Sequence, residues 1–137
     1  MINRIFIGID PGKSGSLAII HTGGDPIEII QFDEKAYINA IADVSTLPCV
    51  ACVEKVGAMP GQGVTSMFTF GKNAGFIEGV LQSYEIPYQL VPPQTWKKEF
   101  QLNSSKQLSV DVCKKLFPSA NLLPTPKCRK ENEESGC

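Results

Sequence analysis

The sequence has little of several features that would each indicate a class of protein. It contains one histidine, His21, and no run of 18 apolar residues. A single histidine with no adjacent nucleophile motif argues against a Ser-His-Asp or Cys-His catalytic group, and a membrane-spanning helix needs a longer apolar run. Asp10 interrupts the first apolar segment too early for a signal-peptide core. We therefore expect a cytoplasmic protein with no membrane partner.

An excess of charge of either sign is also lacking. The 13 basic and 14 acidic side chains give a net charge of −1 over 137 residues, and 42% of the residues are apolar. This composition excludes a disordered polyelectrolyte and a uniformly basic nucleic-acid coat protein. The length is sufficient for one domain with one core. We expect a single α/β domain over residues 1–137.

The positive charges are concentrated toward the C-terminal end of the sequence. Residues 92–137 contain 8 basic and 5 acidic side chains, whereas residues 1–91 contain 5 basic and 9 acidic ones. A locally positive surface can bind a polyanion such as nucleic acid. Solvated lysines without a ligand would give the same count, so charge alone leaves both interpretations open.

The five cysteines are an odd number and are widely spread. A domain of this size does not need disulfides, so we expect reduced thiols. Cys49 and Cys52 have the spacing of a zinc knuckle, but they lie in an expected strand, where the two side chains point to opposite faces. No second pair follows, and we interpret both as structural.

Apolar runs and turn residues predict an alternation of strands and helices. The first three strands are joined by short turns and form an antiparallel meander, over residues 4–9, 16–21 and 27–32. Two more strands are expected over residues 49–53 and 86–91. Helices are expected over residues 34–44, from 65 or 66 to 84, and from a cap at Asn103 or Ser104 to Leu116.

Two carboxylates carry the strongest functional signal. Asp10 follows the first buried strand, and Glu54 follows the fourth. Because burial of an unpaired charge is costly, an acid in such a place usually has a cation, hydrogen-bond donors or a metal. If the two strands are parallel neighbours, about 4.8 Å apart, both side chains can hold the same Mg²⁺. The alternatives are a turn at Asp10 and a surface charge paired with Lys55 at Glu54.

Metal ions held in this way would support phosphodiester hydrolysis. Two such ions about 3.5–4 Å apart can activate water and stabilise the leaving oxygen. The segment from Gly8 to Ser14 is also close to a phosphate-binding P-loop, but three residues separate Gly8 from the Gly12-Lys13-Ser14 unit where four are required. The sequence thus favours metal-dependent chemistry over a P-loop.

The order of these motifs resembles the RuvC-like Holliday-junction resolvases, especially their phage-type members. The resemblance covers about residues 5–129. It rests on Ile7-Gly8-Ile9-Asp10-Pro11-Gly12, Val53-Glu54-Lys55-Val56, Gly61-Gln62-Gly63, the segment from Phe68 to Gly79, Val91-Pro92-Pro93-Gln94-Thr95-Trp96-Lys97-Lys98 and Lys114-Lys115-Leu116-Phe117-Pro118. The resemblance implies an RNase H-like fold, which is a five-stranded mixed sheet in the order 3-2-1-4-5 flanked by helices.

The same resemblance implies a Mg²⁺-dependent endodeoxyribonuclease that cuts four-way DNA junctions in recombination and repair, with Mn²⁺ able to substitute. Asp10 and Glu54 match the metal-binding Asp and Glu of the family. Further acids of the family come from a final helix, which we expect to be absent from this chain. Glu134 could match the first of those acids.

Partners are implied as well. Family members are homodimers on a four-way junction, and the helix of residues 66–84, with Gly71, Gly75 and Gly79 four apart, is similar to the dimer helix. The loop of residues 57–63 matches the region that enters the junction. Trp96 could stack on a base or serve packing. The candidates for phosphate contacts are Lys13, Lys72, Lys97, Lys98, Lys106, Lys114 and Lys115.

Two other functions stay open. Without the final acids, the protein could bind junction DNA, or serve in an assembly, without cutting. It could also be an ATP-binding fragment related to actin and sugar kinases, whose fold likewise begins with a strand, an Asp and a Gly-rich hairpin. Those enzymes need a second similar domain, which 137 residues cannot supply.

Overall fold

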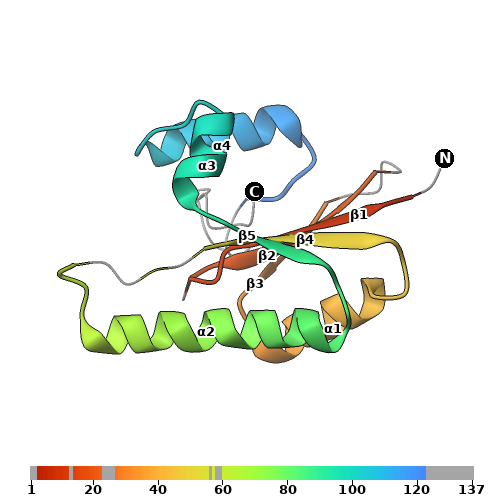
Figure 1. Ribbon diagram of the computed structural model, residues 1–137. Coiled ribbons are helices and arrows are strands. Elements are labelled where there is room, and N and C mark those ends of the chain that lie inside the picture. Colours follow the sequence, from red (N-terminus) through yellow and green to blue (C-terminus); the bar gives the residue numbers. More distant parts are fainter. Residues whose placement is uncertain (1–2, 13, 23–26, 56, 58–59, 123–137) are drawn as a thin grey trace.

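Five strands form one mixed sheet in the order β3-β2-β1-β4-β5. The computed structural model describes residues 3–12, 14–22, 27–55, 57 and 60–122 (Figure 1). The strand pairs β1–β2 and β2–β3 are antiparallel, whereas β1–β4 and β4–β5 are parallel. The expected fold class and strand order are confirmed. The strands are β1 (Ile5–Ile9), β2 (Ser16–His21), β3 (Glu28–Gln31), β4 (Cys49–Glu54) and β5 (Tyr88–Val91).

Helices cover both faces of this sheet. Two of them, α1 (Glu34–Val44) and α2 (Val64–Ser83), lie on one face, and α3 (Pro93–Glu99) and α4 (Lys106–Leu116) lie on the other (Figure 1). The first helix begins where the Asp33 side chain accepts a hydrogen bond from the Ala36 amide at 2.8 Å, a typical N-terminal cap. The sheet is therefore the middle of three layers.

The main core lies between the sheet and the α1–α2 layer. Alternate residues of β1 point into it, namely Ile5, Ile7 and Ile9, and each is at most 4% exposed. Burying a side chain of this size contributes about 1.5–3 kcal/mol. A smaller cluster joins α4 to the other face, around Val110 and Cys113. The larger core therefore fixes which face of β1 and β4 is turned inward.

The helix α3 was not expected from the sequence, which we interpreted as a strand that stops at Pro92-Pro93. In the structure Pro92 is the N-cap, and Pro93 is the first residue of the helix. Proline is favoured at that position because its fixed φ suits a helix and its missing N–H is not needed there. The pair of prolines thus ends a strand and also begins a helix.

The cap of α4 also differs from the expectation. Ser105 is the N-cap, with its hydroxyl accepting from the Leu108 amide at 3.3 Å, whereas we expected Asn103 or Ser104. The Asn103 side chain accepts instead from the Ser105 amide at 2.7 Å. Asn103 therefore builds the turn that precedes the helix, a local role that asparagine often has.

The cysteines agree with the expectation in part. Cys49 and Cys52 are free, with Cys49 packed against the core and Cys52 exposed, as alternation along a strand requires. Cys113 is disulfide-bonded, so the expectation of reduced thiols is wrong at this residue. Number and spacing of cysteines do not determine which thiols the fold brings together. Among the described helices, none has the length and apolar character needed to cross a membrane.

Candidate functional site

The register of β1 and β4 brings the two candidate acids to the same end of neighbouring strands. Ile9 is aligned with Val53, the last pair that the parallel ladder contains. One step further along the same register, Asp10 lies beside Glu54, on strands that are about 4.8 Å apart. Both residues are half-buried. The sequence-based expectation of neighbouring parallel strands is confirmed, and it brings both acids to one edge of the sheet.

Hydrogen bonds fix the backbone and side chain of Asp10. Its Oδ1 accepts from the Gly12 amide at 2.9 Å, and its own amide donates to the Ser16 carbonyl at 3.0 Å. The turn that we considered as an alternative is therefore present. It does not exclude a metal-binding role, because an ionised carboxylate offers about four acceptor positions. The turn instead reduces the freedom of the side chain.

Two glycines allow this turn to close around Asp10. A Cβ added to Gly15 would collide with the carbonyl oxygen of Asp10, so the backbone there has room for glycine alone. A Cβ added to Gly12 would lie 3.2 Å from Oδ1 of Asp10 and 3.6 Å from the ring of Phe70 on α2. The carboxylate thus lies in a tight turn that α2 approaches.

Glu54 is held in the sheet by its pairing with β5. It is the last residue of β4, and it pairs with Val91 of β5. The amide of the next residue, Lys55, donates to the Val91 carbonyl at 2.8 Å. The backbone of Glu54 is therefore fixed by its pairing with β5.

Tyr37 is a third residue of this region, and the sequence analysis did not identify it. Burial raises the pKa of its phenol, and the negative charge of Asp10 raises the pKa further. The phenol therefore stays neutral at physiological pH and can act as a hydrogen-bond donor. A tyrosine on the apolar stripe of a helix is typical of a core residue, so no sequence signal would have singled it out.

The donor set fits a hard divalent cation. Two carboxylates are the usual protein contribution to a Mg²⁺ site, in which water and phosphate oxygens complete the coordination. Within the described ranges, no group of three or more His, Cys, Asp or Glu side chains is placed to hold a metal ion. Two further candidates, Lys13 and Glu134, lie outside the described residues.

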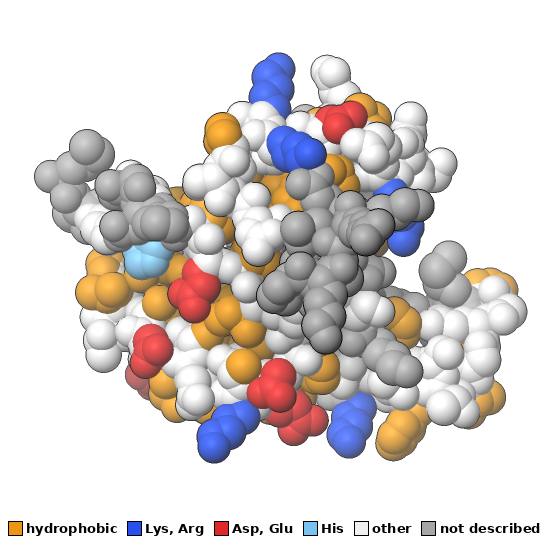
Figure 2. All heavy atoms as spheres, turned by 180° about the vertical axis from the view of Figure 1, so that it is seen from behind, with side chains coloured by type: hydrophobic (Ala, Val, Ile, Leu, Met, Phe, Trp, Pro, Cys, Tyr) orange, Lys and Arg blue, Asp and Glu red, His pale blue; other side chains and the backbone are white. Residues whose placement is uncertain are grey.

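The structure divides the candidate DNA-binding lysines into two groups. Lys72 lies on α2, on one side of the sheet, whereas the other described candidates lie on the α3–α4 side. Basic side chains at the top of Figure 2 belong to this α3–α4 lobe. Lys97 lies 5.6 Å from the centre of the Trp96 ring, a cation–π contact that supports a packing role for the half-buried tryptophan. The lysines of the lobe are Lys97, Lys98, Lys106, Lys114 and Lys115.

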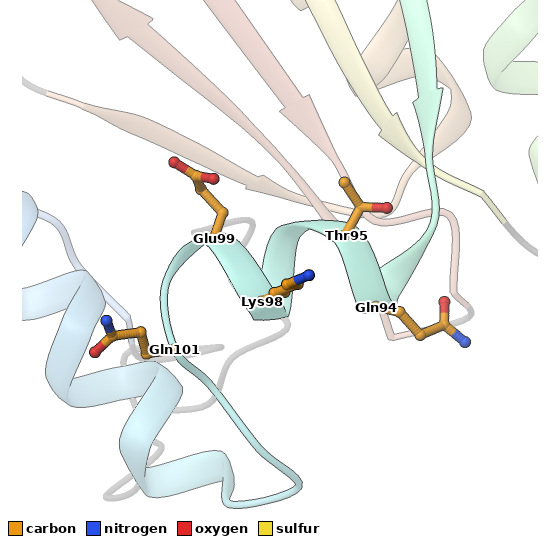
Figure 3. A pocket seen from close by; sticks show the side chains of 5 residues that line it. All are labelled: Gln94, Thr95, Lys98, Glu99 and Gln101. Carbon is orange, nitrogen blue, oxygen red and sulfur yellow. The ribbon is translucent and has the colours of Figure 1, made fainter.

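The lobe also contains a shallow hollow of about 630 Å³ (Figure 3). The sequence analysis missed this hollow because it predicted no helix at α3. Its lining carries one basic and one acidic side chain, so it has no clear preference for an ion of either sign, and we assign no ligand to it. The lining residues are Gln94, Thr95, Lys98, Glu99 and Gln101.

The fold was compared with known proteins. No family model matches the sequence, and no curated protein matches it. Among solved structures, the RuvC of T. thermophilus in complex with a Holliday junction substrate is similar, with a TM-score of 0.62 and 11% identity over 97% of this chain and 87% of that chain. A second Thermus thermophilus RuvC structure gives a TM-score of 0.60 and 11% identity, over 96% and 88%.

The chain has a RuvC-like, RNase H-like fold. At 11% identity the likeness to RuvC lies in the order and direction of strands and in the flanking helices. Such a likeness is invisible to sequence comparison, because many apolar side chains can fill the same core. The likeness covers nearly the whole chain and establishes the fold.

We predict that Gly15→Ala destabilises the protein, because the added Cβ would collide with the carbonyl oxygen of Asp10. The expected loss is about 1–3 kcal/mol in the free energy of unfolding, measured by urea denaturation. Gly57→Ala is the matched control. An added Cβ there would meet nothing within 4 Å, so the free energy of unfolding should stay within about 0.5 kcal/mol of the wild-type value. An unchanged stability of Gly15→Ala would contradict the close approach.

Proposed function

We propose that this protein is a Holliday-junction resolvase, a metal-dependent and structure-selective endodeoxyribonuclease that hydrolyses phosphodiesters at four-way DNA junctions in recombination and repair. The observation that carries the proposal is the parallel register of β1 and β4, whose last pair, Ile9 and Val53, directly precedes Asp10 and Glu54. A neighbour with the same fold has been solved with a Holliday junction substrate. A cytoplasmic location, in a bacterial or phage-infected cell, belongs to this proposal.

In this proposal Asp10 and Glu54 hold Mg²⁺, for which Mn²⁺ can substitute. Once bound, the cation supplies Lewis acidity and lowers the pKa of coordinated water, as phosphodiester hydrolysis requires. The protein holds the two metal-binding residues in position. The Gly12 amide restrains the Asp10 carboxylate, and the pairing with β5 restrains the backbone of Glu54. Little reorganisation is then needed before reaction, which is the general advantage of a rigid site.

Junction DNA would be bound chiefly by charge. The lysines of the α3–α4 lobe lie on one side of the sheet, and apart from the half-buried Lys97 they are exposed. Contacts from such lysines to phosphates raise the affinity for any DNA and make binding weaker at high salt, whereas they add little sequence preference. Selectivity for a four-way junction would then come from its shape and from a second copy of the protein.

A homodimer through α2 is part of the proposal. Val64 and Phe68 are 85% and 72% exposed, although both are large apolar residues. At 100° per residue they share one face of α2 with Gly71, Gly75 and Gly79, opposite the buried Ile77. A Cβ at any of these glycines would meet nothing within 4 Å. A second copy of α2 could therefore approach closely along this face.

A second candidate function is junction binding without cleavage. It is favoured by the metal-site geometry, because the described part of the chain brings no third His, Cys, Asp or Glu to the pair. This candidate shares the fold, the lysines and the dimer with the first one, and it differs only in turnover. The ATP-binding alternative has no supporting contact among the described residues.

We predict that Asp10→Asn abolishes cleavage and leaves junction binding intact, because it removes one metal-binding carboxylate and keeps the shape of the side chain. The rate should fall about 10³-fold or more in a four-way-junction cleavage assay with Mg²⁺ or Mn²⁺. Asp43→Asn is the matched control, an exposed acid in the last turns of α1, and it should cut at the wild-type rate.

Two outcomes of this assay would count against the resolvase. If Asp10→Asn cleaved junctions at the wild-type rate, Asp10 would have no role in the reaction. A wild-type chain that binds four-way junctions and never cuts them, in either metal, would select the second candidate function.

We predict that Gly75→Leu turns the dimer into a monomer, because its side chain would occupy the space that a second α2 requires. Sedimentation velocity measures the change. The monomer should still be folded, as measured by circular dichroism, since a Cβ at this position contacts nothing within the chain. Gly75→Ala, at the same site, should keep the dimer. A wild-type monomer, or a Gly75→Leu dimer, would contradict the α2 interface.

A further inference from the structure

Phe70 is an aromatic residue of α2 that the packing of the main core does not explain. It shares one face of the helix with the buried residues Asn73, Ile77 and Leu81. Its own side chain is only half-buried. Among the described residues, the partly buried apolar side chains that pack on the core include Phe76 of α2 but not Phe70. The contact of this ring lies instead with the turn that follows β1.

The edge of the Phe70 ring lies against Gly12. A Cβ built on Gly12 would be 3.6 Å from Cε1 of the ring, which is an ordinary van der Waals distance, and the Cα of Gly12 is one covalent bond from that point. The preceding residue, Pro11, is fully buried, and its φ is fixed by the proline ring. A buried proline and the edge of an aromatic ring thus both restrict the turn.

Gly12 is the residue whose backbone restrains Asp10. Its amide donates to Oδ1 of the carboxylate at 2.9 Å. Glycine has more backbone freedom than other residues, so the direction of this amide is fixed only if its surroundings fix it. The Cβ built on Gly12 would lie 3.2 Å from the same Oδ1, so Gly12 lies closely between the ring edge and the carboxylate. A smaller side chain at position 70 would leave space into which this glycine could move.

We propose that Phe70 is a positioning residue for Asp10: the edge of its ring packs on Gly12 and keeps the Gly12 amide behind the carboxylate, which is thereby held in the orientation that binds a divalent cation. This inference rests on the proposed function. Donors behind a metal-binding carboxylate orient it, and their loss typically weakens metal binding about 10–100-fold. Phe70 itself would contact neither the cation nor the DNA.

The test is a comparison of Mn²⁺ affinities in the absence of DNA, measured on the 137-residue chain by the electron paramagnetic resonance signal of free Mn²⁺. Phe70→Leu keeps an apolar side chain but removes the ring edge that reaches Gly12, and we expect about tenfold weaker binding. Phe70→Tyr keeps that edge, and we expect it to bind Mn²⁺ as the wild type does.

Phe76→Leu is the matched control for a purely structural effect. It makes the same change on the same helix, at a ring that packs on the core and meets Phe32 edge-on at a centroid distance of 6.4 Å. We expect this variant to melt at a lower temperature than the wild type, because it loses core packing, and to keep the wild-type Mn²⁺ affinity.

Three results would overturn the inference: wild-type Mn²⁺ affinity in Phe70→Leu, equally weakened affinity in Phe76→Leu, or binding by Phe70→Tyr that is as weak as that of Phe70→Leu. If the wild-type chain has no Mn²⁺ site that Asp10→Asn removes, the proposed metal site itself fails, and the inference is overturned with it. The expected affinities in a chain that never cuts junctions would support the inference and contradict only the resolvase.

Discussion

The parallel pairing of β1 with β4 is the contact on which the rest of the structure depends. Ile5 to Ile9 align with Cys49 to Val53 residue by residue, and alternate side chains of both strands are buried against α1 and α2. A shift of one residue would turn every buried side chain of a strand toward the opposite face. The core therefore specifies the register, and the register specifies that Asp10 follows Ile9 at the level of Glu54. The register of β1 and β4 therefore determines both the packing of the core and the placement of the candidate site.

The elements that carry this pairing could be predicted from the sequence, because their apolar patterns are regular. The strand of residues 16–21 and the helix of residues 34–44 have the bounds that we expected. The predictions failed where the same type of residue occurs in two kinds of secondary structure. Ile86 was expected in a strand, but its amide donates to the Leu81 carbonyl at 2.9 Å, after Glu85 with a φ of 55°, so it closes the end of α2. Pro93 was expected to end a strand, but it is the first residue of a helix.

The two carboxylates of the candidate site could also be predicted from the sequence. A carboxylate directly after a buried apolar run is visible in a sequence, and both Asp10 and Glu54 were found in this way. Tyr37 could not be found, because a tyrosine on the apolar face of a helix has the pattern of any core residue. Its buried, unpaired hydroxyl and the raised pKa of its phenol exist only after the chain has folded. The grouping of lysines on the α3–α4 lobe could not be predicted either, because it depends on α3, a helix that was not expected from the sequence.

The most direct measurement of the central claim is the anomalous diffraction of crystals of this chain soaked in Mn²⁺. The account predicts a peak between positions 10 and 54, with carboxylate oxygens of both residues at about 2.0–2.6 Å, the range of oxygen ligands to hard divalent cations. A peak that touches only one of the two carboxylates, or Mn²⁺ bound elsewhere on the protein and absent from this edge of the sheet, would contradict it.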